Sequence, residues 1–141
     1  MNTMKLEEKG KIIPAPVLSK YPEIVSKEIQ HWAGIISATH WEIWNRNKPN
    51  GADFYVGEKE LGHIHLDGSV HIPSTKKFAK ALINAGLAQK FPYGEDWVQY
   101  SISDNKSAAH AIWLFKLHYD FLNGTDAVNL MQTISDYKVI S

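Results

Sequence analysis

The chain has 141 residues, of which 44% are hydrophobic and 21% are charged, and this is the size and composition of one ordinary globular domain. Fifteen basic residues balance fifteen acidic ones, and Arg46 is the only arginine, so no excess positive charge draws the chain to nucleic acid or to an anionic membrane. The absence of cysteine excludes disulfides, thiolate catalysis and cysteine-based metal sites.

The first 18 residues show no apolar periodicity and carry Gly10, Pro14 and Pro16, which predicts a flexible N-terminal arm. Residues 19–141 are then expected to form a single domain. The arm lacks the apolar segment of a signal peptide, and no apolar stretch is long enough to span a bilayer. We therefore expect a cytoplasmic protein that binds neither membranes nor nucleic acid.

The remaining elements follow from apolar spacing and from turn residues. A helix is expected over about 20–32, strands over 35–44, 53–56, 61–66 and 69–73, a helix from Ser74 or Thr75, a strand over 97–103, a long helix from Asp104 or Ser107, and a short helix capped by Thr125. Short turns between strands give an antiparallel sheet, and the helices must cover one face of it. The expected fold is therefore α+β, a two-layer domain with an antiparallel sheet of about four to five strands.

Three of the seven histidines fall within nine residues, at His63, His65 and His71. His63 and His65 project from the same face of a strand, because side chains alternate with period two. A three-residue loop of Leu66, Asp67 and Gly68 places His63 opposite His71 and lets the intervening aliphatic residues enter the core together. We therefore predict one aliphatic face and one face with three imidazoles.

Three neutral imidazoles on one face suit a divalent transition metal with an open position for water or substrate. His63, His65 and His71 are accordingly the candidate metal ligands. The alternative is a set of half-buried histidines that bond to backbone or water and bind no metal. Glu60 is a candidate general base or a partner that orients the histidines.

The string from Gly51 to Pro73, with its Glu60-x-Gly62-His63-x-His65 box, the later Trp97 strand and the helical residues up to Tyr119, resembles the luciferase-like domains of bacteria and fungi. The resemblance covers roughly Gly51 to Tyr119, and it departs from the family pattern at His71 and at Lys59. It implies that Glu60, His63 and His65 belong to a family pattern; most members of the family have no known function.

Together these features predict a small-molecule-binding domain whose polar site comprises Glu60, His63 and His65, with Trp41 and Trp44 able to line the pocket of a flat ligand. Catalysis is left open. The alternative is a non-catalytic module that binds another protein through a flat apolar surface. A concave pocket beside Glu60, His63 and His65 would favour the first of these two functions.

Overall fold

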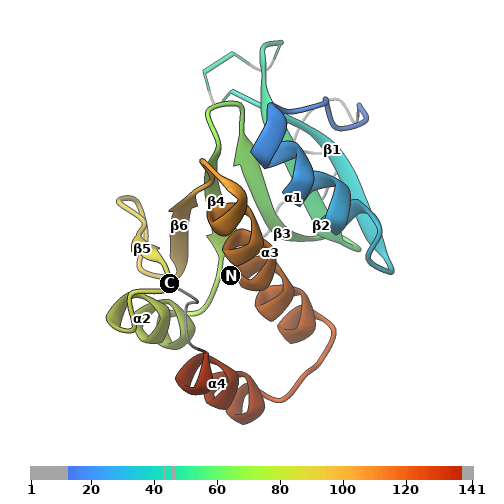
Figure 1. The fold of residues 1–141 in the computed structure, drawn as a ribbon. Helices are drawn as coiled ribbons and strands as arrows, with labels where there is room; N and C mark the ends of the chain where they lie inside the picture. The colour runs from blue at the N-terminus through green and yellow to red at the C-terminus, as the bar shows by residue number, and fades with distance from the viewer. Residues whose placement is uncertain (1–12, 43, 46, 138–141) are drawn as a thin grey trace.

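In the computed structural model, which describes residues 13–42, 44–45 and 47–137, six antiparallel strands form one sheet in the order β1-β2-β3-β4-β6-β5. The strands are β1 (Ile35–Trp41), β2 (Pro49–Val56), β3 (Lys59–His65), β4 (Ser69–Pro73), β5 (Gln89–Lys90) and β6 (Trp97–Ser101) (Figure 1). The α+β class is confirmed, and the sheet has one strand more than the upper limit expected. The added strand is β5, whose two residues are too few to show an alternating pattern.

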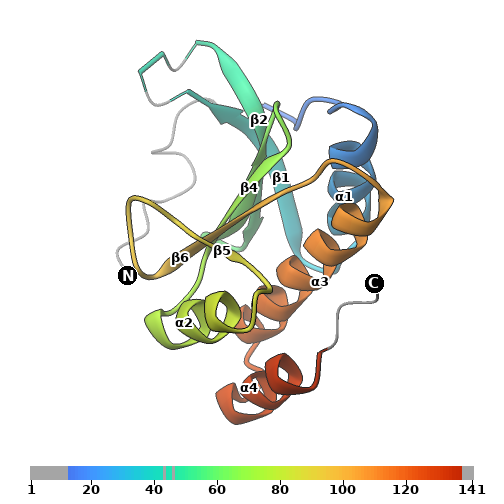
Figure 2. The ribbon, with the colours of Figure 1, turned by 60° about the vertical axis from the view of Figure 1, so that its left-hand side comes forward.

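Four helices accompany the sheet: α1 (Lys20–Gln30), α2 (Lys76–Asn84), α3 (Asn105–Leu122) and α4 (Ala127–Asp136). Helices α1 and α3 lie side by side on one face of the sheet, α2 lies beside β5 and β6, and α4 packs against α2 and α3 (Figure 2). The helices among the described residues therefore leave the opposite sheet face open.

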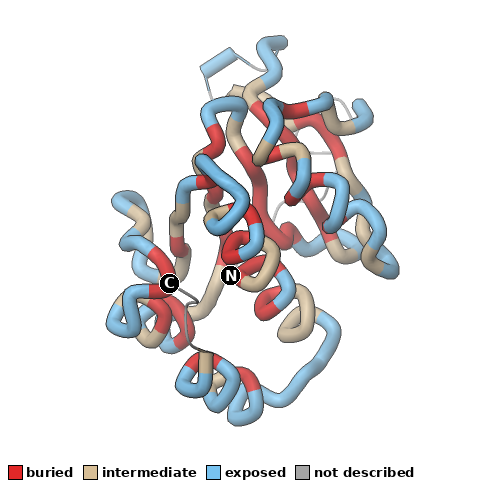
Figure 3. The backbone as a smooth tube through the Cα atoms, in the orientation of Figure 1, coloured by how far each residue is buried: buried red, intermediate tan, exposed pale blue. Residues whose placement is uncertain are grey.

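The core lies between the sheet and α1 with α3, where buried segments of both layers face each other (Figure 3). Ile64, Val70 and Val98 point inward from neighbouring strands, and Phe115 of α3 packs edge-on against Phe54 with ring centroids 6.0 Å apart. One face of each central strand is thus committed to apolar packing, which leaves the alternate residues for the other face.

The helix starts follow the expected capping chemistry at two of three places. The Thr75 hydroxyl accepts from the Phe78 amide at 3.1 Å, and Asp104 and Ser107 form a reciprocal capping box. The prediction that Thr125 caps the last helix is wrong, because the neighbouring Asp126 is the cap and accepts from the backbone at 2.7 Å.

The hairpin between β3 and β4 has the predicted three-residue loop. His63 pairs with His71 and Ile64 with Val70, and the Gly68 amide donates to the His65 carbonyl at 3.0 Å. Gly68 has φ +91°, and a Cβ there would lie 2.6 Å from the carbonyl oxygen of Ile102. Glycine therefore fixes both the loop length and the face on which the histidines project.

The predicted N-terminal arm lies in part outside the described residues, which begin at Ile13. The backbone carbonyl of Ile13 accepts from the Thr39 amide at 2.6 Å, and the Pro14 carbonyl accepts from the Thr39 hydroxyl at 2.9 Å. Leu18 is buried in the core. None of the described helices combines the length and the apolar character needed to cross a membrane.

Candidate functional site

Four imidazoles gather on the open face of the sheet, contributed by three strands. His40 comes from β1, His63 and His65 from β3, and His71 from β4. The three predicted rings are brought together: His71 Nδ1 lies 3.2 Å from His63 Nε2 and 3.1 Å from His65 Nε2. His40 stacks on His63 with centroids 4.0 Å apart and an angle of 11° between the planes.

His40 joins the cluster through strand register. It pairs with Gly51, and Gly51 in turn pairs with His65, so the two histidines lie on one line across the sheet. A Cβ at Gly51, where φ is +138°, would lie 1.9 Å from the Ile64 carbonyl oxygen, so only glycine fits between these strands. Alternation within β1 would have shown which face His40 shares, but not that β1 lies beside β3 through β2.

An outer set of polar side chains contacts the Nδ1 atoms of three of these rings. Glu60 Oε2 lies 2.8 Å from His63 Nδ1, and Asn50 Nδ2 lies 3.0 Å from His65 Nδ1. Asp53 Oδ1 lies 3.0 Å from His40 Nδ1. The Nδ1 atoms of three rings therefore face protein groups, which leaves their Nε2 atoms for other partners.

A β-bulge brings Glu60 to His63. Two residues three apart on a regular strand point to opposite faces. Here Phe54 pairs with Gly62 while Tyr55 pairs with Glu60, so β3 carries one residue more than β2 at this point. The bulge returns Glu60 to the face of His63, where its carboxylate is 9% exposed. The predicted orienting contact is present.

Asp53 is a buried carboxylate that the sequence reading did not single out. Its Oδ2 accepts a hydrogen bond from the Tyr55 hydroxyl at 3.1 Å. Its Oδ1 is buried and has no hydrogen-bond partner, although His40 Nδ1 and His63 Nδ1 lie 3.0 and 3.5 Å away. A charged residue directly before the apolar run over residues 54–56 of the predicted strand is the signal that could have identified it.

Burial keeps two of the histidines neutral. Loss of solvation, followed by the neighbouring His63, lowers the pKa of His65 to about 3, and the same causes lower the pKa of His71 to about 4. Burial and the adjacent Asp53 also raise the pKa of the Tyr55 hydroxyl. At neutral pH, His65 and His71 are therefore uncharged imidazoles, the form that binds metals and accepts hydrogen bonds.

Two groups among the described residues have the donors and the spacing to hold a metal ion. In one, ligand atoms of His40, His63 and His65 lie within 4.8 Å of one another; in the other, those of Asp53, Glu60 and His63 do. The first group contains two of the three predicted ligands, with His40 in place of His71. The second group consists entirely of buried residues.

A pocket of about 520 Å³ opens above the imidazoles. Its floor holds the four histidines, and its lining is completed by Glu42, Trp44, Asn50, Phe91, Tyr93 and Trp97. Phe91 stacks on Trp97 with centroids 5.5 Å apart, whereas Trp44 and Tyr93 are 95% and 88% exposed. Trp41, predicted to bind ligand, is not among these lining residues, and its role stays a prediction.

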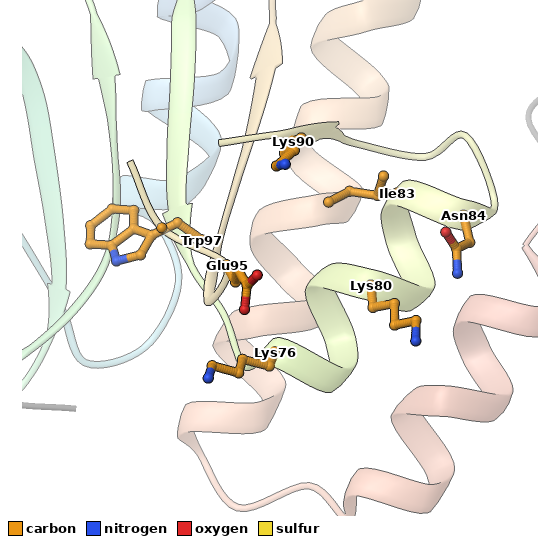
Figure 4. A pocket seen from close by; sticks show the side chains of 8 residues that line it. Lys76, Lys80, Ile83, Asn84, Lys90, Glu95 and Trp97 are labelled. Atoms are coloured by element: carbon orange, nitrogen blue, oxygen red, sulfur yellow. The ribbon is translucent and has the colours of Figure 1, made fainter. Parts of the chain in front are cut away.

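A second pocket of about 380 Å³ lies beside α2 and is lined by Lys76, Lys80, Lys90 and Glu95, with Trp97 shared between the two pockets. Figure 4 shows the lysine side chains around this pocket and the indole ring of Trp97 pointing away from them. These lysines are exposed, and a solvated helix face accounts for them. The histidine pocket is therefore the candidate site.

Comparison with known proteins gives a match to a protein family. Residues 58–118 match the family described as Luciferase domain, a range that includes the Glu60 box, β4, β6 and most of α3. No curated protein and no solved structure matches the chain. The match confirms the resemblance expected from the sequence: over residues 58–118 the chain is similar to the Luciferase domain family.

Proposed function

We propose that this protein binds a small, flat molecule in the histidine pocket. The observation that carries the proposal is the pocket itself, a concave space of about 520 Å³ with imidazoles on its floor and aromatic rings on its walls. Ligand sites are typically concave, largely apolar and supplied with a few convergent polar groups. A concave pocket, rather than a flat apolar face, supports this function over a protein-interaction module.

In this proposal the aromatic walls of the pocket pack against the ligand, and the imidazoles of its floor form hydrogen bonds with it. Phe91 and Trp97 are stacked on each other and form a rigid aromatic wall beside His71, whose ring centroid lies 4.9 Å from that of Phe91. The exposed rings of Trp44 and Tyr93 are placed to cover a bound molecule. The imidazoles supply hydrogen bonds to its polar atoms, and Glu60 orients His63 from behind.

The divalent transition metal expected from the sequence is part of the proposal. His63 and His65 belong both to the predicted ligand set and to the histidine group with metal-compatible spacing. An ion on the pocket floor would face the pocket, where a bound molecule could reach it. Cytoplasmic residence remains part of the proposal as well.

Protein NMR with a library of flat aromatic and heteroaromatic fragments tests ligand binding, using protein treated with a chelator. The indole N–H signals report directly, since Trp44 and Trp97 line the pocket whereas Trp32 packs on Tyr119 and Trp113 on Tyr137. We expect fragments that shift the signals of Trp44 and Trp97 and leave those of Trp32 and Trp113 in place.

Tyr93→Ala, which removes one rim ring, should weaken such a fragment about three- to tenfold, the worth of an aromatic contact. Val128→Ala is the matched control, because Val128 is similarly exposed, at 76%, but lies on α4. The proposal fails if no fragment shifts the two pocket indoles, or if both variants weaken binding equally.

A further inference from the structure

We infer that the pocket floor is a mononuclear transition-metal site in which His40, His63 and His65 bind the ion through their Nε2 atoms, with His71 beside the open coordination position. Each of the three rings offers one nitrogen atom, and these three atoms lie within 4.8 Å of one another. Ligand atoms around a tetrahedral zinc lie about 3.4 Å apart, so modest side-chain rotation closes the set. This inference depends on the proposed function in one respect: the same pocket must leave one coordination position of the ion open.

The contacts behind the rings select Nε2 as the ligating atom. A metal-bound histidine almost always engages its other ring nitrogen with a carboxylate, an amide or a carbonyl oxygen. His63 engages Glu60 in this way at 2.8 Å. His40 Nδ1 lies 3.0 Å from Asp53 Oδ1, within ion-pair distance but without a hydrogen bond. His65 faces the Asn50 amide, whose oxygen and nitrogen are interchangeable by rotation. Two of the three proposed ligands thus have a hydrogen-bonded outer partner, and the third, His40, has a carboxylate within ion-pair distance of its Nδ1 atom.

Hydrogen bonding within the cluster is incomplete without a cation. His71 Nδ1 lies within hydrogen-bond distance of Nε2 of both His63 and His65. A ring nitrogen carries either one hydrogen or one lone pair, so His71 satisfies only one of these two atoms at a time. An ion bound to His63 and His65 engages both lone pairs and frees His71 Nδ1 for a water or a ligand atom on the ion.

The buried Asp53 carboxylate also points to a cation. Its Oδ1 has no hydrogen bond, and within the described part of the chain only the imidazoles of His40 and His63 lie within ion-pair distance of it. Burying a carboxylate oxygen without a hydrogen bond is costly, so a positive charge on the imidazole side would stabilise it. A divalent ion on His40 and His63 supplies it. Three imidazoles suit Zn²⁺, Co²⁺, Ni²⁺ or Cu²⁺.

Cobalt binding tests the assignment, because Co²⁺ bound to protein nitrogen gives visible absorption bands that report coordination directly. Tag-free, chelator-treated protein is titrated with Co²⁺ and Zn²⁺, and bound metal is counted by elemental analysis. We expect about one equivalent in the wild type. His40→Gln and His65→Gln should each lower the affinity by more than the roughly 10- to 100-fold expected for loss of an outer partner such as in Asp53→Asn.

Two further variants test which histidines bind the ion. His71→Gln should keep one equivalent of metal and lose less affinity than His40→Gln or His65→Gln, because His71 lies beside the ion and does not bind it directly. His31→Gln is the control for the loss of any one of the seven histidines. His31 is exposed and follows the last residue of α1, outside the pocket lining. Thermal unfolding of each variant without metal establishes that it is folded.

A measurement on the wild type covers the case in which a variant does not fold. In ¹⁵N-labelled protein, Zn²⁺ should shift the Nε2 resonances of three imidazoles and leave their Nδ1 atoms protonated. The inference is overturned if less than about a tenth of an equivalent of metal binds, if His71→Gln loses metal while His40→Gln retains it, or if Nδ1 is the atom that shifts. Fragment binding in chelator-treated protein is a separate result, so the proposed binding of a flat molecule and the proposed metal site can each fail alone.

Discussion

The buried His118, which lies outside the pocket lining, should make the folded protein less stable in mild acid. The side chain is 3% exposed; its Nδ1–H donates to the Leu114 carbonyl at 2.8 Å, and its Nε2 accepts from the Ser74 hydroxyl at 2.8 Å. Both ring nitrogens are therefore satisfied in the neutral form. Burial lowers the pKa of His118 from 6.5 to about 4. The folded state thus resists a proton that the unfolded chain accepts.

The sign and size follow from proton linkage. Between pH 6.5 and pH 4 the unfolded chain binds more protons at this residue than the folded protein does, so stability is complete above pH 6.5 and falls with acidity. Lowering the pH from 7.5 to 5.0 should cost about 2 kcal/mol at His118 alone, since one pKa unit is worth about 1.4 kcal/mol. The depressed pKa values of His65 and His71 add a loss in the same direction.

A variant isolates the contribution of His118. His118→Asn keeps a donor near the position of Nδ1 but does not titrate, so its free energy of unfolding in urea should fall by about 2 kcal/mol less than that of the wild type over the same pH interval. His31→Gln, at an exposed position, should keep the full wild-type pH dependence. Equal losses in His118→Asn and the wild type would refute the reasoning, because the other histidines are common to both.

Two further substitutions probe the packing around the site. Gly62→Ala places a Cβ 2.8 Å from Phe115 Cε1, whereas Gly57→Ala has a positive φ but meets no atom within 4 Å, so urea unfolding should show Gly62→Ala to be the more costly by about 1–3 kcal/mol. Equal costs would mean that the backbone, and not the clash, decides. Tyr55→Phe removes the hydrogen bond to Asp53 and should lower the free energy of unfolding by about 1–3 kcal/mol, and an unchanged urea midpoint would contradict this.

The part of the site that the sequence predicts is its local part. His63 and His71 are joined by a short hairpin, and the Asp-Gly turn together with the burial of Ile64 and Val70 leaves one register in which the aliphatic residues share a face. The hairpin was therefore predictable from a window of about ten residues. The helix caps at Thr75 and Asp104 are local in the same sense.

What the sequence does not predict depends on pairing between distant strands or on an irregularity within one. His40 and Asp53 reach the cluster because β1 and β2 lie next to β3 in a particular register, and alternation along each strand carries no information about that register. Glu60 was singled out from its place beside the histidines, but strict alternation would have put it on the opposite face from His63. Only the bulge between these residues brings the two side chains together.

The two faces of strand β3 differ in polarity, and this difference indicates why the polar cluster is present. Ile64 faces α3 and the core, while His63 and His65 on either side of it face the pocket. Replacing buried charged groups by apolar residues of similar size is often neutral or stabilising, so a sheet that needed only stability would not bury Asp53 and Glu60 behind imidazoles. The four aromatic residues of the pocket could have packed against aliphatic side chains instead. A costly polar layer beneath an open pocket is the arrangement expected where a ligand or an ion is to be held, and this is the physical reason for proposing a binding site on this face of the sheet.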